Sequence, residues 1–564
     1  MAASQKQEEL LSISMQVTDS ERKKSPNLDA GYSQDGTYVE IIVRYVGVLS
    51  DIEKIYDGVT VIELLNNYGI IIAPKDSIED IINEKNIEYA EKPKLLYFDL
   101  ANGKQASCIS PVQISRESSL GLFGEGTIVA IIDTGINPYL SDFRNVDGST
   151  RLVNIWDQSN DTELDKDGIN EYLEMGEAGR IPGYDTVGHG TNVARIACGN
   201  EGVASQAEII VVKMGVAGEL GEYTFPRTTQ LMRAVDYCIR KGLDYDKPIA
   251  INISFGNNYG DHTGGTLLES YLNSVSGVGR NVICVGSGNE GVAATHTSGV
   301  LTDAVELDVE LAVSQYETSL DIQIWKEYVD DFEVEIITPS GVNIGRINRY
   351  NQVNRAIVGS TEVLTYYGEP SPYNMHQEIY INLLPRDNYI QEGIWRIRLV
   401  PLRIVSGRFD MWLPAVSSIN EGTGFVSPDE ELTFTIPGTA EGVITVGAYN
   451  AITDTYATFS GVGYVVTESV KTIVKPELVA PGVDIRVSEN VTVTGTSFAT
   501  PFVTGSAALL MEWGIVRGND VFLYNEKVKA YFLRGARRLT GQTRPSDRSG
   551  WGALCVDDSL LINS

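Results

Sequence analysis

The spacing of apolar positions divides the first hundred or so residues into a leader and a small structured unit. Residues 1–34 are polar and show little periodicity, so we expect a flexible leader without fixed structure. The apolar positions that follow predict a compact α+β unit, which we place at residues 35–105. Its expected elements are a strand at 38–47, a helix at 59–69, a strand at 70–74, a capped helix at 77–85 and a strand at 95–100.

A different texture begins after the polar, turn-rich run 101–119, which suits an exposed connection between two domains. From residue 126 onward, strands that are almost entirely Val and Ile alternate with helical stretches. Such strands are typical of a parallel sheet that is buried on both faces, so we expect an α/β domain. The strands are expected at 127–133, 207–215, 249–256 and 281–291, with helices at 190–199, 228–242 and 267–275 between them.

Between residues 300 and 428 the pattern changes to short alternating strands separated by turn residues, with little helix. This pattern predicts an antiparallel β-sandwich. The α/β texture then resumes, with strands near 444–449 and 475–485 and helices at 497–513 and 525–538. The β segment is therefore expected to be an insertion that divides one α/β domain into residues 106–299 and 429–564.

Composition and charge exclude several classes of function. Hydrophobic residues make up 43% and charged residues 21% of the 564 residues, which is the composition of a folded globular protein. The 44 Lys and Arg residues are outnumbered by 75 Asp and Glu residues, which gives a formal net charge of −31. A field of that sign repels phosphate backbones and anionic lipids, so we expect no nucleic acid partner.

The cysteines and the chain ends bear on the compartment. The five cysteines are too scattered for a disulfide framework, and we expect mostly buried thiols in a reducing environment. We find no readable export signal and no run of about 18 apolar residues that would span a membrane. The chain has no Asp-rich loop with calcium-ligand spacing, so we predict no metal site and no cofactor, although structural calcium stays possible. We expect a monomer.

Three short stretches place a reactive side chain among glycines at the end of an apolar element. Asp133 ends a buried strand, His189 opens a helix between Gly188 and Gly190, and Ser497 lies at the start of another helix. A carboxylate, an imidazole and a hydroxyl are the parts of a nucleophilic relay, in which Ser attacks, His takes the proton and Asp orients the His. Each residue alone is more often a cap or a turn residue. The three together predict acyl transfer.

The blocks 133–135, 188–191 and 495–501 resemble, in that order, the three signature blocks of the subtilisin-like serine proteases. The resemblance covers residues 120–295 and 430–560 and implies a subtilisin-like parallel-sheet core. It implies that Asn289 is the oxyanion asparagine. It also implies two walls of the primary specificity pocket, which are Ser254, Phe255 and Gly256 on one side and Gly286, Ser287 and Gly288 on the other.

The sequence departs from that family's pattern in three ways. Asn192 stands where the family commonly has a second His, and Arg195 stands where a Gly is common. Neither belongs to the relay, so activity is still expected. In addition, 208 residues separate Asn289 from Ser497. The predicted β insertion accounts for this long spacing.

The whole arrangement resembles the Csp proteases of spore-forming clostridia, which act in spore germination. That resemblance implies that residues 35–105 are a prodomain that folds the core, is cut off by the enzyme and stays bound noncovalently. It implies a jelly-roll insertion and, as substrate, the zymogen of a cortex-lytic hydrolase. We predict the self-cleavage bond at Gln105–Ala106. We also expect synthesis in the cytoplasm and incorporation in the spore.

Two alternatives to an active germination protease stay open. One is a pseudoprotease that acts as a scaffold or signalling protein, and it would fail to react with a fluorophosphonate once the prodomain is removed. The other is a general degradative subtilase, which would be abundant in the culture fluid. The intact set of Asp133, His189, Asn289 and Ser497 favours the active protease.

Overall fold

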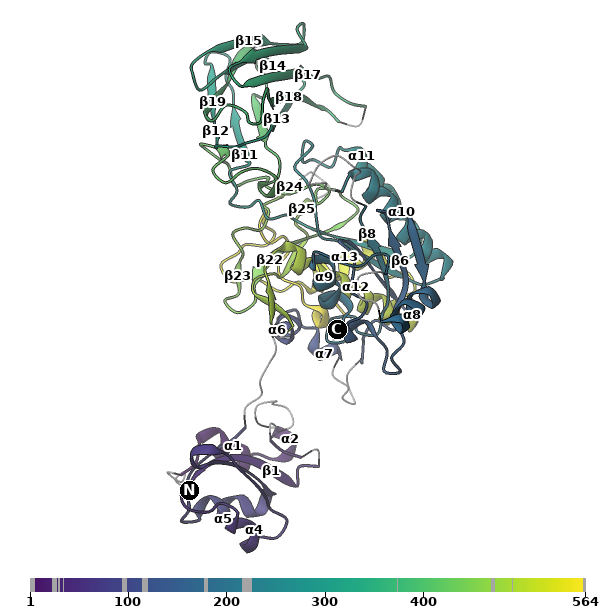
Figure 1. Ribbon diagram of the computed structural model, residues 1–564, viewed down its shortest axis with the longest axis vertical. Helices are drawn as coiled ribbons and strands as arrows, with labels where there is room; N and C mark the ends of the chain where they lie inside the picture. The colour runs from purple at the N-terminus through teal and green to yellow at the C-terminus, as the bar shows by residue number, and fades with distance from the viewer. Residues whose placement is uncertain are drawn as a thin grey trace. The chain divides into compact units, whose positions relative to one another are not determined.

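The fold was analysed in a computed structural model of the chain (Figure 1). It describes residues 6–22, 28, 31–33, 35–93, 99–113, 120–176, 181–215, 226–372, 374–467, 472–488 and 490–560. The chain forms two compact units, residues 1–98 and 99–564, and each is described by itself.

The N-terminal unit is built on one antiparallel sheet in the order β2-β3-β1-β4. Its strands are β1 (Tyr38–Tyr45), β2 (Thr60–Glu63), β3 (Tyr68–Pro74) and β4 (Ile87–Glu91). The described helices are α1 (Glu9–Gln16), α2 (Asp19–Arg22), α4 (Asp51–Ile55) and α5 (Ile78–Asn83). Alternate residues of β1 and β3, such as Ile41 and Ile71, are fully buried and pack on α5, so the predicted α+β unit is present.

Two expectations for this unit are wrong. The segment 59–69 is not a helix, because its β-branched residues form β2, which pairs antiparallel with β3. The leader is not structureless, because α1 buries Leu11 in the core of the unit. Serines occupy two buried positions of α1 and break the apolar pattern. The helix could therefore not be predicted from the sequence. The strand expected at 95–100 lies largely outside the described residues, and Asp99 begins a helix.

The second unit contains the α/β core that the sequence predicts. Its nine-stranded sheet has the order β23-β22-β10-β9-β5-β8-β6-β7, with β26 beside β22. All pairs are parallel except β22 with β23 and β6 with β7. The strands are β5 (Ile128–Asp133), β6 (Leu152–Asp157), β7 (Thr162–Asp165), β8 (Glu208–Lys213), β9 (Ile249–Ile253), β10 (Asn281–Gly286), β22 (Ile444–Asn450), β23 (Thr455–Tyr456) and β26 (Leu478–Pro481).

Helices cover both faces of this sheet. The described ones are α8 (Lys166–Met175), α9 (His189–Cys198), α10 (Thr228–Asp244), α11 (Leu267–Val275), α12 (Thr496–Met511), α13 (Glu526–Gly535) and α14 (Val556–Ser559). Val129 and Ile131 of β5 face a cluster formed with α9, α12 and α13, while Ile128 and Ala130 face one formed with α10 and α11. Burial on both faces explains why these strands are continuous Val and Ile runs.

The helix α12, with its continuation to Val516, is long and apolar enough to cross a membrane by length and composition. It is the only such helix in the described part of the chain. Its residues from Phe498 to Met511 are all buried between the sheet and α9. The apolar composition of α12 is therefore that of a central core helix.

The insertion is an antiparallel β-sandwich of two sheets, as predicted. One sheet has the order β11-β20-β13-β18-β17-β16 and the other β15-β14-β19-β12-β21, with an apolar core between them. The first consists of β11 (His296–Val300), β20 (Arg408–Trp412), β13 (Leu320–Glu327), β18 (His376–Pro385), β17 (Thr361–Tyr367) and β16 (Val353–Val358). The second consists of β15 (Asn343–Ile347), β14 (Asp331–Ile337), β19 (Gly393–Arg403), β12 (Leu307–Val313) and β21 (Gly424–Phe425).

The expected exposed connection at 101–119 is instead packed on the core where it is described. It forms α6 (Asp99–Ala106) and α7 (Ser110–Gln113), and Ile109 and Val112 are buried. Cys108 forms a disulfide with Cys555, which the scattered cysteine spacing did not predict. The other three cysteines, Cys198, Cys238 and Cys284, are free and buried, as expected.

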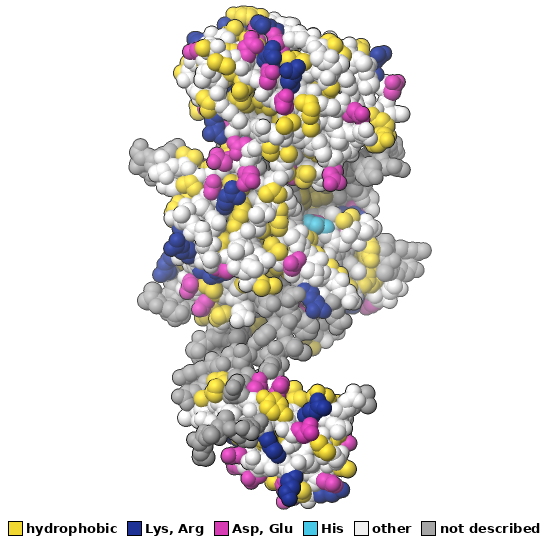
Figure 2. Space-filling view, turned by 90° about the vertical axis from the view of Figure 1, so that its left-hand side faces the viewer, with side chains coloured by type: hydrophobic (Ala, Val, Ile, Leu, Met, Phe, Trp, Pro, Cys, Tyr) yellow, Lys and Arg dark blue, Asp and Glu magenta, His cyan; other side chains and the backbone are white. Residues whose placement is uncertain are grey.

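Surface charge is distributed without a single dominant patch on the face drawn in Figure 2. Asp and Glu side chains there are interspersed with Lys and Arg. The net charge of −31 is therefore not gathered into one acidic surface on that face.

Candidate active site

The carboxyl end of β5 and the start of α9 bring Asp133 and His189 into direct contact. The His189 Nδ1 donates to Asp133 Oδ1 over 2.7 Å. The Asp133 side chain is 1% exposed and that of His189 is 30% exposed, so the acid is buried and the imidazole reaches the surface. Asp133 Oδ1 also accepts from the Thr134 amide at 2.7 Å, which fixes the orientation of the carboxylate. This pair has the geometry of the acid and base of the predicted relay.

A second carboxylate, Asp185, holds the segment that carries His189, and the sequence analysis did not identify it. Asp185 Oδ1 accepts from the Gly188 amide at 2.7 Å and from Thr134 Oγ1 at 2.9 Å. Its Oδ2 accepts from the Thr191 amide and hydroxyl at 2.9 and 2.7 Å. Burial alone would raise the pKa of Asp185, but these hydrogen bonds outweigh it and lower the pKa. Asp185 is a positioning residue, and its place three residues before Gly188 was the available signal.

Ser497 lies in the first turn of α12, where the structure locks it against the end of β9. The Ser497 Oγ donates to the carbonyl oxygen of Ser254 at 2.9 Å, and Ser254 Oγ donates to the carbonyl oxygen of Ser497 at 3.0 Å. The next residue, Phe498, places its ring 5.2 Å from the ring of His189. The start of α12 is therefore beside the Asp133–His189 pair, and the Ser497 hydroxyl would have to leave the Ser254 carbonyl to bond to the imidazole.

Asn289 is held at the start of α12 by hydrogen bonds that its side-chain oxygen accepts. Its Oδ1 accepts from the Thr496 amide at 3.0 Å and from Thr496 Oγ1 at 3.1 Å. Because the oxygen is occupied by two donors, the Nδ2 group is left to donate to a substrate. The amide of Ser497, in the first helical turn, can supply a second donor. These are the two donors that an oxyanion hole would need.

The two predicted walls of the specificity pocket face each other across Thr435, which the sequence analysis missed. A Cβ at Gly256 would lie 2.6 Å from Thr435 Oγ1, and a Cβ at Gly288 would lie 2.7 Å from the same atom. The Thr435 amide donates to the carbonyl oxygen of Ser287 at 3.1 Å. The side chain of Thr435 therefore lies between the two predicted walls, where it would form a short floor with a hydroxyl.

The remaining predicted wall residues support the pocket from behind. Gly286 packs against α12, since a Cβ there would lie 3.2 Å from Thr500 Oγ1. The side chain of Ser287 is fully buried, with its Oγ 3.2 Å from Ser460 Oγ. Phe255 is half-buried and packs on the core cluster beside α10 and α11. Of the predicted wall residues, Gly256 and Gly288 are the ones that face the side chain of Thr435.

The predicted self-cleavage bond Gln105–Ala106 lies at the end of α6. Gln105 is exposed, while the carbonyl oxygen of Ala106 accepts from Arg537 Nε at 3.3 Å. A Cβ at Gly103 would come within 2.4 Å of Phe502, so α6 packs closely on α12. Cleavage at this bond would require the last turn of α6 to unwind. The bond stays a prediction.

Comparison with known proteins gives matches over both units. The model of the subtilase family matches residues 124–362 and 410–552, which include the relay residues and Asn289. The model described as the Csp protease B prodomain matches residues 5–94. Among solved structures, the chain is similar to the CspB protease of Clostridium perfringens, with 37% identity and a TM-score of 0.75. That match covers 82% of this chain and 98% of the other.

Curated relatives are much longer. The PII-type proteinase of Lactococcus lactis subsp. cremoris is 22% identical over 94% of this chain and 30% of its own length. The PII-type proteinase of Lacticaseibacillus paracasei is 22% identical over 53% of this chain and 16% of its own length. The chain thus spans less than a third of these relatives. The family match covers most of the α/β core and the prodomain match most of the N-terminal unit, so the chain belongs to the subtilase family of serine proteases and carries a prodomain of the Csp protease B type.

Proposed function

We propose that the chain is a serine endopeptidase that removes its own prodomain and then activates the zymogen of a cortex-lytic hydrolase during spore germination. The contact of 2.7 Å between Asp133 and His189, next to Ser497 and the outward amide of Asn289, carries the catalytic part of this proposal. The similarity to the Clostridium perfringens CspB protease supports the prodomain and germination parts. The protein would be a monomer stored in the spore.

The residues suggest the following chemistry. Ser497 Oγ attacks the scissile carbonyl, and its proton passes to Nε2 of His189 while Asp133 holds Nδ1–H. The resulting oxyanion receives hydrogen bonds from Asn289 Nδ2 and the Ser497 amide. His189 then returns the proton to the leaving amine, and water releases the acyl group from Ser497. No step needs a metal ion or a cofactor.

The proposal is tested by the masses of the expressed chain. Wild type should give two fragments under denaturing conditions that stay together under native conditions, because the prodomain remains bound noncovalently. The Ser497→Ala variant should stay at full length. A wild type that is uncut and that fails to react with a fluorophosphonate after prodomain removal would contradict the proposal.

An uncut and unreactive wild type would favour a pseudoprotease scaffold. One observation supports this alternative. Ser497 Oγ is hydrogen-bonded to the Ser254 carbonyl and not to His189. Hydroxyls of free enzymes often adopt such positions and align only with substrate bound. Labelling of Ser497 by a fluorophosphonate therefore separates a resting enzyme from a silenced one.

N-terminal sequencing of the large fragment tests the position of self-cleavage. A cut at Gln105–Ala106 would leave a chain that begins at Ala106, with Cys108 joined to Cys555. We expect the new terminus to stay anchored on the core by this disulfide and by the hydrogen bond from the Val556 amide to the Ser107 carbonyl, 3.0 Å long. A terminus at another residue would refute the predicted bond and leave the protease proposal intact.

The floor at Thr435 predicts the preference for the P1 residue. A short pocket with a hydroxyl favours small side chains or those, such as the Gln at position 105, that offer a hydrogen-bonding group. Thr435→Gly should raise kcat/KM for a P1 Phe relative to a P1 Ala by about 10–200-fold, which is the usual effect of one methylene group more or less in a pocket. A fluorogenic library varied at P1 measures this ratio, with Thr435→Ser as the control that keeps the hydroxyl. An unchanged ratio would mean that Thr435 does not bound the pocket.

The environment of His189 predicts the pH dependence of reaction. Burial alone would lower the pKa of His189, but the charge and hydrogen bond of Asp133, with the charge of Asp185, outweigh it and raise the pKa above its ordinary value of 6.5. The imidazole must be neutral to accept the Ser497 proton. Reactivity should therefore fall as the pH falls, with a midpoint above 6.5. The rate of fluorophosphonate labelling between about pH 5 and 9 checks this, and a midpoint at or below the ordinary value would contradict it.

A further inference from the structure

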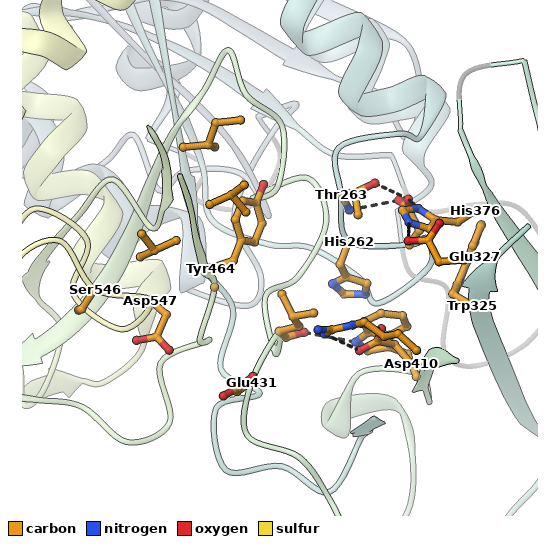
Figure 3. Close-up of a pocket in the computed structure, with 18 of the residues that line it drawn as sticks. His262, Thr263, Trp325, Glu327, His376, Asp410, Glu431, Tyr464, Ser546 and Asp547 are labelled. Atoms are coloured by element: carbon orange, nitrogen blue, oxygen red, sulfur yellow. Dashed lines mark hydrogen bonds and ion pairs between the residues drawn. The ribbon is translucent and has the colours of Figure 1, made fainter. Parts of the chain in front are cut away.

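A cavity of about 760 Å³ lies between the β-sandwich insertion and the α/β core, and none of the relay residues line it. Its walls come from the loop after β9, from the outward face of β13, β18 and β20, and from the hairpin of β24 (Tyr464–Thr467) and β25 (Thr472–Lys475) (Figure 3). The volume is in the range of small-molecule sites, which often form where two domains meet. The cavity is therefore large enough to bind a small molecule, and its lining indicates which chemical class would fit.

The charged groups around this cavity are unbalanced. Five carboxylates line it, those of Asp261, Glu327, Asp410, Glu431 and Asp547. Asp261 accepts from His376 Nδ1 at 2.8 Å, and Asp410 pairs with Arg408 at 3.2 Å. Lys326 also lines the cavity, but its ammonium group turns inward and donates to the carbonyl oxygens of Glu327 and Asp330.

Two carboxylates on one side of the cavity form no ion pair. Glu431 and Asp547 form no ion pair in the described part of the chain, although the charge of Arg408, which lines the cavity and pairs with Asp410, also acts on Glu431. Figure 3 shows both on the side where Tyr464 and Ser546 lie, across from Glu327 and Trp325. Glu431 is exposed and Asp547 is half-buried, so both can reach a ligand in the cavity. A cation would satisfy them.

His262, in the cavity wall, adds an acceptor that lacks a donor. The side chain is 1% exposed, and its Nε2 lies 3.3 Å from the carbonyl oxygen of Asn258. A carbonyl can only accept, so Nε2 holds the proton and Nδ1 presents a lone pair. No hydrogen-bond partner of Nδ1 is found among the described residues. Burial, with the nearby His296, lowers the pKa of His262 to about 4, so the ring is neutral.

Aromatic rings complete the lining. The ring of His262 stacks on Trp412 with centroids 4.2 Å apart, and Trp325 and Tyr464 line opposite sides of the cavity (Figure 3). Ring faces attract organic cations, while carboxylates and a neutral imidazole nitrogen accept hydrogen bonds. Guanidinium and ammonium groups have donors only, which matches a lining with an excess of acceptors.

Two short segments connect this cavity to the specificity pocket. The loop that forms the wall at Gly256 continues to Asp261, and the segment from Glu431 continues to the floor at Thr435. Between the two sites, Asn257 and Ile436 exchange backbone hydrogen bonds of 3.0 and 2.7 Å. A ligand in the cavity would therefore contact both segments that shape the specificity pocket.

We propose that the cavity between insertion and core binds an organic cation, a guanidinium or an ammonium group, through Glu431 and Asp547. The cation can come from a free small molecule or from a basic side chain of a protein substrate, since the same group is recognised in both cases. This site is separate from the relay, so binding does not depend on catalytic activity.

Calorimetric titration of the full chain carrying Ser497→Ala tests the proposal. The probes are agmatine and a blocked Gly-Gly-Arg-Gly-Gly peptide, and the matched control is the same peptide with citrulline, which has the shape of Arg without its charge. Both cations should bind, and the citrulline peptide should bind at least about tenfold more weakly, as expected for charge-assisted hydrogen bonds. Equal binding of the two peptides, or no binding of either cation, would overturn the proposal.

Variants locate the site. Glu431→Gln with Asp547→Asn should weaken agmatine binding at least about tenfold. Asp387→Asn with Glu421→Gln removes the same charge from exposed positions of the insertion and should leave binding unchanged. Unchanged binding in the first pair would refute the site. If the double variant of Glu431 and Asp547 fails to fold, the comparison of the Arg and citrulline peptides on the unaltered cavity still tests whether a cation binds.

The source of the cation is separated with the wild-type protein. If the source is a free cation, agmatine should change KM or kcat for a short peptide substrate that cannot reach the cavity. If it is a basic segment of a protein substrate, agmatine should slow only the cleavage of the protein, by competition. Either result identifies the source, provided that agmatine binding has been measured as above.

Discussion

Asp133→Asn should lower kcat about 10⁴-fold without unfolding the protein, by analogy with the same change in a serine protease relay. Asp133 Oδ1 accepts from both His189 Nδ1 and the Thr134 amide, so an Asn oxygen in this place would keep both hydrogen bonds but lose the charge that stabilises the imidazolium, whereas an Asn turned over would point its NH₂ group at His189. In the second case the imidazole must present a lone pair at Nδ1, which places the proton on Nε2. His189 could then no longer take the proton of Ser497.

Turnover of a peptide substrate, together with the labelling rate of Ser497, measures this loss. The control is Asp236→Asn, which removes a carboxylate from the exposed Arg240 pair on α10 and should leave turnover unchanged. KM should change little, because Asp133 is buried behind His189 and does not touch the substrate. A variant that keeps turnover within about tenfold of wild type would show that Asp133 does not set the tautomer of His189.

Glu477→Gln should cost about 3–5 kcal/mol in the free energy of unfolding of the core, the usual penalty for breaking a buried ion pair. Glu477 is 5% exposed, and its Oε1 lies 3.0 Å from Lys475 Nζ and 3.4 Å from Lys529 Nζ. Its Oε2 accepts from the Thr445 amide at 2.7 Å. Loss of the negative charge would leave the buried ammonium group of Lys475 without a counterion, while Lys529 would keep only its pair with the exposed Glu526 at 3.2 Å.

Denaturant unfolding in the Ser497→Ala background, which prevents self-digestion, measures this change. Replacing all three groups with apolar residues, as Lys475→Met, Glu477→Leu and Lys529→Met, should recover most of the loss, since no charge stays buried. Asp236→Asn, at an exposed pair, should cost less than about 1 kcal/mol. A loss from Glu477→Gln as small as that of Asp236→Asn would mean that the cluster is hydrated.

The confirmed predictions rest on patterns that local chemistry imposes. The core strands are readable because a parallel sheet covered on both faces needs apolar side chains at every position, as in β5 and β10. The sandwich is readable because its strands bury alternate residues, as β18 does. The relay residues stay a prediction: Asp133, His189 and Ser497 stand in short blocks, where glycines let the backbone turn next to a reactive group.

The errors arise where a local pattern and tertiary pairing disagree. Residues 59–69 carry apolar spacing that suits a helix, yet β3 offers an unpaired edge, and its backbone groups pair with Thr60–Glu63. The connection at 101–119 looks polar and turn-rich, yet α6 fits against Phe502 because Gly103 has no side chain. Neither partner is adjacent in sequence, so neither could be inferred from composition.

The sequence by itself determined the fold class, the order of the domains, the insertion after Asn289 and the choice of candidate relay residues, since each depends on residues close together in the chain. The tertiary structure alone decided that Thr435 stands between Gly256 and Gly288, that Asp185 holds the start of α9, that Cys108 pairs with Cys555, and that a cavity forms between insertion and core. Most of these features join side chains that are distant in sequence, and even Asp185, only three residues from Gly188, acts through its contact with Thr134. Such contacts are set by how the segments pack against one another and leave no periodic signal in the chain.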